Sequence, residues 1–224
     1  VMYGAVEFYQ AAKARGLHPI LGCEVYVAPR GRLDKVQELD REPFHLVLLC
    51  ENQQGYQNLT QLVSKAWTEG FYGKPRVDRA LLQEHREGLI ALSACLAGEI
   101  PRALRNGERE RAKETALFYQ ELFGKGNFFL ELQDHGIREQ ALVNDGLIRL
   151  SEETGIPLVA TNDCHYLRRE DSKMHKILLC IQTNHTVLDP DGMEFASDQF
   201  YVKSEEEMRR LFAAVPQACD NTVE

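Results

Sequence analysis

The stretch that decides the fold is Ile156-Pro157-Leu158-Val159-Ala160-Thr161-Asn162-Asp163-Cys164-His165. Its apolar part has the length and the β-branched content of a buried strand, and it is too short to form a helix of its own. If the strand continues to its end, Asp163 and His165 lie on one face, because side chains alternate along a strand. A carboxylate and an imidazole side by side can share a metal ion. An ordinary polar strand-to-helix turn remains the alternative for a single such site.

Similar apolar runs recur along the chain between segments with helical spacing. The runs at 19–27, 44–50, 88–95 and 127–135 favour strands, and helical patterns occupy 4–15, 52–67, 78–85, 98–122 and 139–153. This alternation predicts an α/β fold with a mainly parallel sheet. After residue 168 the pattern changes to helices at 172–182 and 204–212, with a short strand at 199–203. Ser204 and Glu207 form the signature of a helix capping box.

Composition and charge narrow the range of functions. The 224 residues suffice for one large domain or two small ones. Lys and Arg number 26 against 34 Asp and Glu, and the net charge of −8 is unfavourable for holding a phosphate backbone unaided. No apolar run approaches the roughly 20 residues that a membrane helix needs. The six cysteines contain no C-x-x-C pair, which favours reduced thiols and a cytoplasmic location.

Polar residues interrupt or end the apolar runs. They are Glu24, His45, Cys95, Asp134, His135, Asp163 and His165. In a sheet of this class the strand ends lie on one face, and catalytic and binding residues are usually found there. These residue types bind zinc or manganese, and a carboxylate such as Glu24 can bridge two ions about 3.5–4 Å apart. Taken singly, Cys95 could be a small buried group and His45 a hydrogen-bonded core histidine.

Several segments resemble a known family. LGCEVYVAPR (21–30), KPRVDRALL (74–82), GLIALSACLAGE (88–99), FFLELQDHG (128–136) and LVATNDCHY (158–166) resemble the N-terminal polymerase and histidinol phosphatase (PHP) domain of bacterial DNA polymerase III alpha subunits. The resemblance covers essentially the whole chain. It implies a distorted (βα)7 barrel over residues 1–170, followed by a segment, 171–224, that leads toward the polymerase palm.

The resemblance also implies a metal-ligand set. Members of the family bind up to three metal ions on one face, and the matching positions here are Glu24, His45, Cys95, Asp163 and His165. Asp134 and His135 match no primary ligand position, so we assign them to substrate contacts or to support of the ligands.

The family carries further ligands in a His-x-His strand and a Thr-Asp-His-Gly stretch that would precede Val1. On that pattern the position built from Glu24, His45 and Cys95 keeps all its protein ligands. The other two positions keep only part of theirs. We therefore expect at most partial metal occupancy, and an N-terminally incomplete barrel with an open sheet edge. A truncated chain and an omitted segment both fit this pattern.

The resemblance implies that the parent protein is the catalytic subunit of a replicative, DNA-directed DNA polymerase that uses magnesium. The intact domain would be a metal-dependent 3′–5′ exonuclease in which Glu24, Asp163 and His165 are catalytic, whereas this chain alone is expected to be inactive. The implied partners are DNA and other replicase subunits, including a proofreading subunit, with no membrane. Two alternatives stay open. One is a stand-alone phosphatase for a small monoester such as histidinol phosphate, and the other is a purely structural or docking domain.

Overall fold

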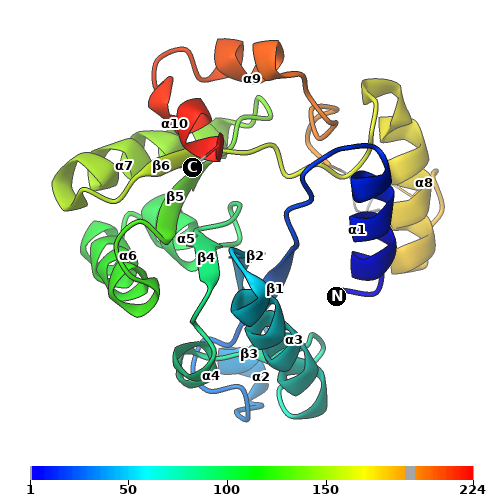
Figure 1. The fold of residues 1–224 in the computed structure, drawn as a ribbon. Coiled ribbons are helices and arrows are strands. Elements are labelled where there is room, and N and C mark those ends of the chain that lie inside the picture. Colours follow the sequence, from blue (N-terminus) through cyan, green and yellow to red (C-terminus); the bar gives the residue numbers. More distant parts are fainter. Residues whose placement is uncertain (1, 190–194, 224) are drawn as a thin grey trace.

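Six strands form one open sheet at the centre of the molecule. The computed structural model describes residues 2–189 and 195–223. The sheet has the order β3-β1-β2-β4-β5-β6 (Figure 1). The strands are β1 (Gly22–Val27), β2 (Phe44–Cys50), β3 (Arg76–Val77), β4 (Leu89–Leu92), β5 (Phe128–Leu132) and β6 (Leu158–Ala160). The expected α/β fold is therefore confirmed, in a barrel-like arrangement that does not close.

The direction of β2 distinguishes this sheet from a purely parallel one. β1 pairs with β3, β4 with β5, and β5 with β6 in parallel, whereas β2 is antiparallel to both β1 and β4. One strand thus runs against the other five, and the prediction of a mainly parallel sheet is right except at β2. β1 meets β3 only at Tyr26 and Val27, so the edge from Gly22 to Val25 has no ladder partner on that side among the described residues. This is the expected open edge.

Helices surround the sheet (Figure 1). α3, α6 and α7 pack against its strands. The side chains of Asn52 and Asp78 cap α3 and α4 by accepting hydrogen bonds from backbone N–H groups, and the predicted capping box of Ser204 and Glu207 is present at α9. The helices are α1 (Ala5–Ala14), α2 (Gln37–Asp40), α3 (Gln53–Thr68), α4 (Arg79–Glu84), α5 (Glu99–Arg105), α6 (Arg109–Phe123), α7 (Arg138–Thr154), α8 (Ser172–Thr183), α9 (Glu205–Leu211) and α10 (Gln217–Asp220), with 3-10 turns at Arg169–Asp171 and Asn221–Val223.

The two faces of the sheet bury different sets of side chains. Leu46 and Leu48 of β2 point outward into the main core, which they share with α3. Their neighbours Val47 and Leu49 face the opposite way, against a smaller apolar cluster built on Leu92, Phe129 and Val159. Because side chains alternate along a strand, Glu24 and His45 share this inner face with Val47.

The segment after residue 171 is joined to the sheet. α10 packs against β6, and the Asn221 side-chain amide donates to the Leu158 carbonyl over 2.7 Å. Ala218 and Cys219 belong to the main core. Among the residues described, no helix combines the length and apolar character that a bilayer crossing requires.

Three strands end earlier than the sequence pattern predicts. β4 stops at Leu92, β5 at Leu132 and β6 at Ala160. The prediction of a strand continuing through Asp163 and His165 is therefore wrong. The chain leaves the sheet after Ala160, and Asp163 adopts a φ of +41°, outside the extended region. The predicted strand at 199–203 is also wrong, since Tyr201 makes only an isolated bridge to Tyr166.

Candidate metal centre

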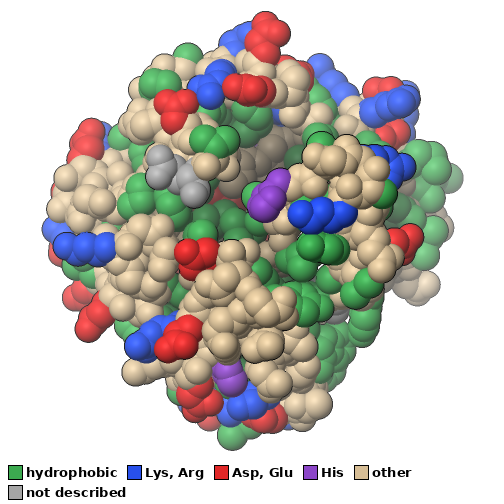
Figure 2. All heavy atoms as spheres, viewed as in Figure 1, with side chains coloured by type: hydrophobic (Ala, Val, Ile, Leu, Met, Phe, Trp, Pro, Cys, Tyr) green, Lys and Arg blue, Asp and Glu red, His purple; other side chains and the backbone are tan. Residues whose placement is uncertain are grey.

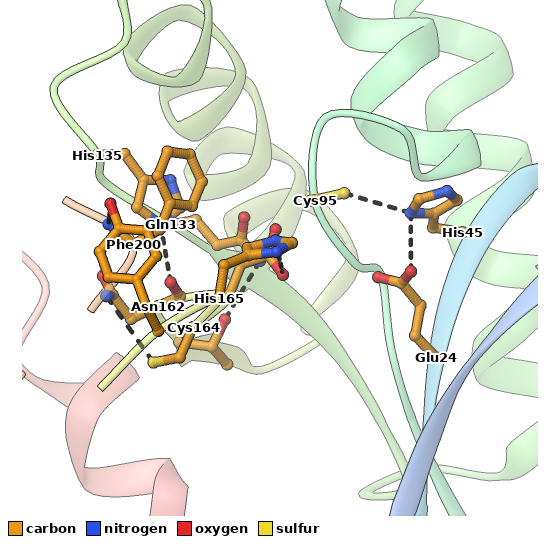
Figure 3. A network of polar contacts seen from close by, with 12 residues as sticks. Glu24, His45, Cys95, Gln133, His135, Asn162, Cys164, His165 and Phe200 are labelled. Atoms are coloured by element: carbon orange, nitrogen blue, oxygen red, sulfur yellow. Dashed lines mark hydrogen bonds and ion pairs between the residues drawn. The ribbon is translucent and has the colours of Figure 1, made fainter. Parts of the chain in front are cut away.

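Three of the predicted ligands converge at one end of the sheet. Glu24 lies in the middle of β1, His45 is the second residue of β2, and Cys95 lies in the turn after β4. His45 Nδ1 is 3.1 Å from Glu24 Oε1 and 3.5 Å from Cys95 Sγ (Figure 3). One ligand atom from each residue lies within 4.8 Å of the other two. We refer to these three residues as the EHC group.

The reversed direction of β2 explains why His45 joins this group. A residue at the start of a strand parallel to its neighbours would lie at the wrong end of the sheet. Since β2 is antiparallel, its first residues lie beside the last residues of β1, and His45 pairs directly with Tyr26. The Tyr26 ring contacts the imidazole edge-on, with ring centroids 5.1 Å apart.

The turn after β4 brings the third ligand to the other two. The His45 N–H donates to the Ala97 carbonyl over 3.1 Å, and Gly98 N–H donates to the Cys95 carbonyl over 2.8 Å. A side chain at Gly98 would place a Cβ 2.1 Å from the Ser93 carbonyl oxygen, so only glycine fits this close approach. The tight turn therefore fixes Cys95 beside β2.

The donor set of the EHC group fits zinc. A thiolate, an imidazole nitrogen and a carboxylate oxygen are the ligands that zinc takes in proteins, and three protein ligands leave a fourth position open in catalytic sites. All three side chains remain partly accessible, with 36% of the Glu24 side chain and 25% of the His45 side chain exposed. The residues present thus fit a borderline metal ion that keeps one position for solvent or substrate.

The electrostatics of this end of the sheet also favour a cation. Burial raises the pKa of the Cys95 thiol to about 12, only partly opposed by a hydrogen bond from the Ala97 backbone. The carboxylates of Asp163, Glu24 and Glu131 raise it further. Without a cation the thiol is therefore protonated at neutral pH. A metal ion would have to displace that proton, and it would neutralise the surrounding negative charge.

Asp163 and His165 form a separate pair close to the EHC group. His165 Nε2 lies 3.5 Å from Asp163 Oδ1. Burial raises the pKa of Asp163, but the hydrogen bond and the charge of His165 outweigh it, and the net shift is downward. The hydrogen bond to Asp163 raises the pKa of His165. Charge interactions link Asp163 to His45 and His165 to Glu24, although neither Asp163 nor His165 belongs to the EHC group itself.

Of the two residues assigned to substrate or support, His135 is built into the protein interior. Its exposed fraction is 1%, and its ring stacks on Phe200 with centroids 3.8 Å apart. Its Nε2 lies 2.8 Å from the Asn162 carbonyl, and its Nδ1 is 2.7 Å from the Gln140 side-chain nitrogen. Burial lowers the pKa of His135, so the ring is neutral, donating from Nε2 and accepting at Nδ1. No edge of the ring is left for substrate.

Asp134 has a local role in the same turn. Its Oδ1 accepts a hydrogen bond from the Gly136 N–H over 2.9 Å, which closes the turn between β5 and α7. The side chain is half-buried. His135 rather than Asp134 therefore contacts the backbone beside Asp163.

One buried residue at this end of the sheet, Glu131, was not among the predicted site residues. Glu131 is 4% exposed, although it lies in the apolar strand β5. The signal was a carboxylate inside the run FFLEL, which is the same kind of signal that drew attention to Glu24. Its side chain bonds to both loops that carry candidate ligands. Figure 2 shows that histidine and acidic side chains border a hollow in the middle of the face viewed in Figure 1.

The chain is similar to a known domain family and to several named proteins. The model of the PHP domain family matches residues 1–135. The chain is 48% identical over 223 residues to DNA polymerase III subunit alpha of Treponema pallidum, and 43% identical over 223 residues to that of Borreliella burgdorferi. It is 46% identical over 231 residues to that of Thermus aquaticus. Each alignment covers 99% or 100% of this chain but 19% of the relative, so the chain spans about a fifth of the length of these proteins.

Proposed function

The chain belongs to the PHP domain family, and from this premise we propose that the EHC group binds a divalent ion, zinc or manganese. The observation that carries the proposal is the approach of Glu24, His45 and Cys95 ligand atoms to within 4.8 Å of one another. The Asp163–His165 pair would face the same space and contribute to a second, less complete position. When bound, the ion would supply Lewis acidity toward a phosphate oxygen.

The protein side chains would hold the ions that orient the phosphate. Glu24 and His45 would hold the ion on the sheet side. Asp163 and His165, 3.5 Å apart, would hold an ion on the opposite side. This chemistry is hydrolysis of a phosphodiester, and we propose that the complete domain acts as a metal-dependent 3′–5′ exonuclease. The chain alone is proposed to be inactive.

We further propose that the chain is the PHP domain, residues 1–170, of a replicative DNA polymerase alpha subunit, with residues 171–224 connecting it to the polymerase palm. DNA synthesis with magnesium would then belong to the longer protein. The support is that the relatives quoted above, all named DNA polymerase III subunit alpha, align with nearly all of this chain. The proposed partners are DNA and other replicase subunits, including a proofreading subunit, in the cytoplasm. With a net charge of −8, DNA contact would depend on the rest of the polymerase.

A structural or docking domain remains the second candidate. It is favoured by the fact that Asp163 and His165 lie outside the EHC group, since a single ion held by three residues can serve folding alone. The names of the relatives give no support to the stand-alone phosphatase.

A cobalt titration tests the proposed metal site. Cobalt in place of zinc gives a charge-transfer absorption band when it binds a thiolate. We expect this band in the wild-type chain but not in Cys95→Ser. The control is Cys164→Ser, which removes the exposed thiol between Asp163 and His165 and should keep the band. A band that survives Cys95→Ser would refute the assigned site. Chelator-sensitive release of nucleotides from single-stranded DNA by this chain would refute its proposed inactivity.

A further inference from the structure

Glu131 occupies a central place between the two groups of candidate ligands. It is the fourth residue of β5, and it pairs with Val159 of β6, while β4 lies on the other side of the strand. The turn with Cys95 follows β4, and the turn with Asp163 follows β6. The carboxylate is buried, with 4% of the residue exposed.

One carboxylate oxygen holds the turn that carries Cys95. Glu131 Oε2 accepts a hydrogen bond from the Ala94 N–H over 2.9 Å, and the Glu131 N–H donates to Ser93 Oγ over 2.8 Å. Ala94 has a φ of +63°, a left-handed conformation that alanine rarely adopts. The bond to Glu131 therefore stabilises a strained residue immediately before Cys95.

The other carboxylate oxygen holds the turn that carries Asp163. Thr161 donates its hydroxyl to Glu131 Oε1, and the Gln133 amide donates to the same oxygen over 3.1 Å. Thr161 precedes Asp163 by two residues, and Asp163 also has a positive φ, +41°. Each oxygen of one buried side chain thus serves a different strained turn.

We propose that Glu131 is a positioning residue that fixes Cys95 and the Asp163–His165 pair relative to one another through hydrogen bonds to Ala94 and Thr161. Its use as support for a metal centre rests on the proposed function. Its effect on the two turns does not. A residue that merely fills the core would act through its volume, whereas a positioning residue acts through its acceptor atoms.

Two substitutions separate volume from hydrogen bonding. Glu131→Met keeps the length of the side chain but leaves the Ala94 N–H without its acceptor. Glu131→Gln keeps an oxygen for Ala94 and turns its nitrogen toward Thr161, whose hydroxyl can accept. The Gln133 amide, whose nitrogen donates to Glu131 Oε1 in the wild type, would turn over so that its Oε1, a buried acceptor with no partner among the described residues, accepts the second N–H of the new amide. Glu131→Gln is therefore the matched control.

A third substitution tests the hydrogen bond between Thr161 and Glu131 by itself. Thr161→Val removes the hydroxyl that donates to Oε1 and retains a β-branched side chain of similar size. Thr60→Val is its control, because Thr60 donates only to the Tyr56 carbonyl on the exposed surface of α3.

Backbone amide exchange and chemical shifts of the metal-free chain give the first readout. In Glu131→Met we expect exchange at Ala94 to accelerate at least tenfold, with shifts of the Cys95, Asp163 and His165 amides. Glu131→Gln should stay within about threefold of the wild type. Thr161→Val should shift Asp163 and His165 but leave Ala94 protected. These results do not depend on metal binding.

Cobalt affinity gives the second readout. Loss of residues that support metal ligands lowers affinity by about 10–100-fold, and we expect that loss in Glu131→Met but not in Glu131→Gln. The proposal is overturned if folded Glu131→Met keeps wild-type protection at Ala94, or if Glu131→Gln loses as much as Glu131→Met. If Glu131→Met does not fold, the proposal fails when Thr161→Val leaves Asp163 and His165 unchanged. Failure of the wild-type chain to bind cobalt would refute the metal site and leave the amide result to decide on Glu131.

Discussion

Metal binding at the EHC group should release one proton per ion, because the Cys95 thiol is protonated at neutral pH. Burial is the main cause of its pKa of about 12. Removing the proton at pH 7, five pH units below that pKa, costs about 7 kcal/mol at 1.36 kcal/mol per unit. Structural zinc sites bind with an apparent free energy of about 10–16 kcal/mol at pH 7, which already includes deprotonation of their own thiols, so the high pKa of Cys95 should weaken zinc binding without abolishing it. The affinity should then rise about tenfold for each unit of pH.

The assay is a zinc titration against a competing chelator at several pH values between 7.5 and 9. We expect a slope of one in the logarithm of the association constant against pH, after correction for the chelator. Calorimetry in two buffers of different ionisation enthalpy should give one proton released per zinc. Cys164→Ser should behave like the wild type, whereas Cys95→Ser should bind more weakly and lose the slope, since a serine hydroxyl keeps its proton. A wild-type slope near zero would show that the Cys95 thiolate is not a ligand.

Three further results are expected. Burial lowers the pKa of His135, so its contribution to stability is present above its unfolded pKa of about 6.5 and is lost as the pH falls below that value, by up to about 1.4 kcal/mol per pH unit. The free energy of unfolding, measured with urea, should therefore change less between pH 7.5 and pH 5.5 in His135→Gln than in the wild type. An equal change in the two proteins would contradict this. The hydrogen bond from Arg30 lowers the pKa of Asp40 to about 2. The loss of unfolding free energy in Asp40→Asn, relative to the wild type, should therefore be largest above about pH 4 and should shrink as the pH falls toward 2. A loss that does not change with pH would refute this. The free energy of unfolding of Ala94→Gly should stay within about 0.5 kcal/mol of the wild type, because relief of the positive φ offsets the added freedom of the unfolded chain. Ala91→Gly, inside β4, should lower it by about 1 kcal/mol or more. Equal losses of stability in thermal unfolding would show that Ala94 is not strained.

Glu24, His45 and Cys95, which the structure brings together, were visible in the sequence, but the reasons for their convergence were not. Glu24 and His45 stood out because each is a polar residue within or beside an apolar run, and local patterns of this kind are visible in a single sequence. The direction of β2 is not a local property. It depends on which strands pair, and it is the feature that carries His45 to the same end of the sheet as Cys95.

The turns after the strands were the least predictable part. Asp163 and His165 lie close together, as expected, but by way of a turn with a positive φ rather than an extended strand. That turn depends on partners distant in sequence, including the carbonyl contact from His135 and the hydroxyl bond between Thr161 and Glu131. Such contacts come from tertiary packing, and alternation along a strand does not reveal them.

β3 and the buried arginine of KPRV illustrate the same limit. Arg76 is fully buried, and its guanidinium donates to the carbonyls of Gly70, Asp40, Arg32 and Asp34. A charged residue in a polar segment gives no sign of such burial. Its partners come together only when the segment between β1 and β2 and the loop after α3 fold against β3.

The metal content of the purified chain tests the central claim most directly. The chain is prepared without added metal, and zinc and manganese are measured per chain by elemental analysis. We expect about one ion per chain, bound at the EHC group, in the wild type and in Cys164→Ser, and a large loss of metal in Cys95→Ser. A wild-type chain that carries no metal and takes up none when zinc is supplied would contradict the assignment of Glu24, His45 and Cys95 as a metal centre.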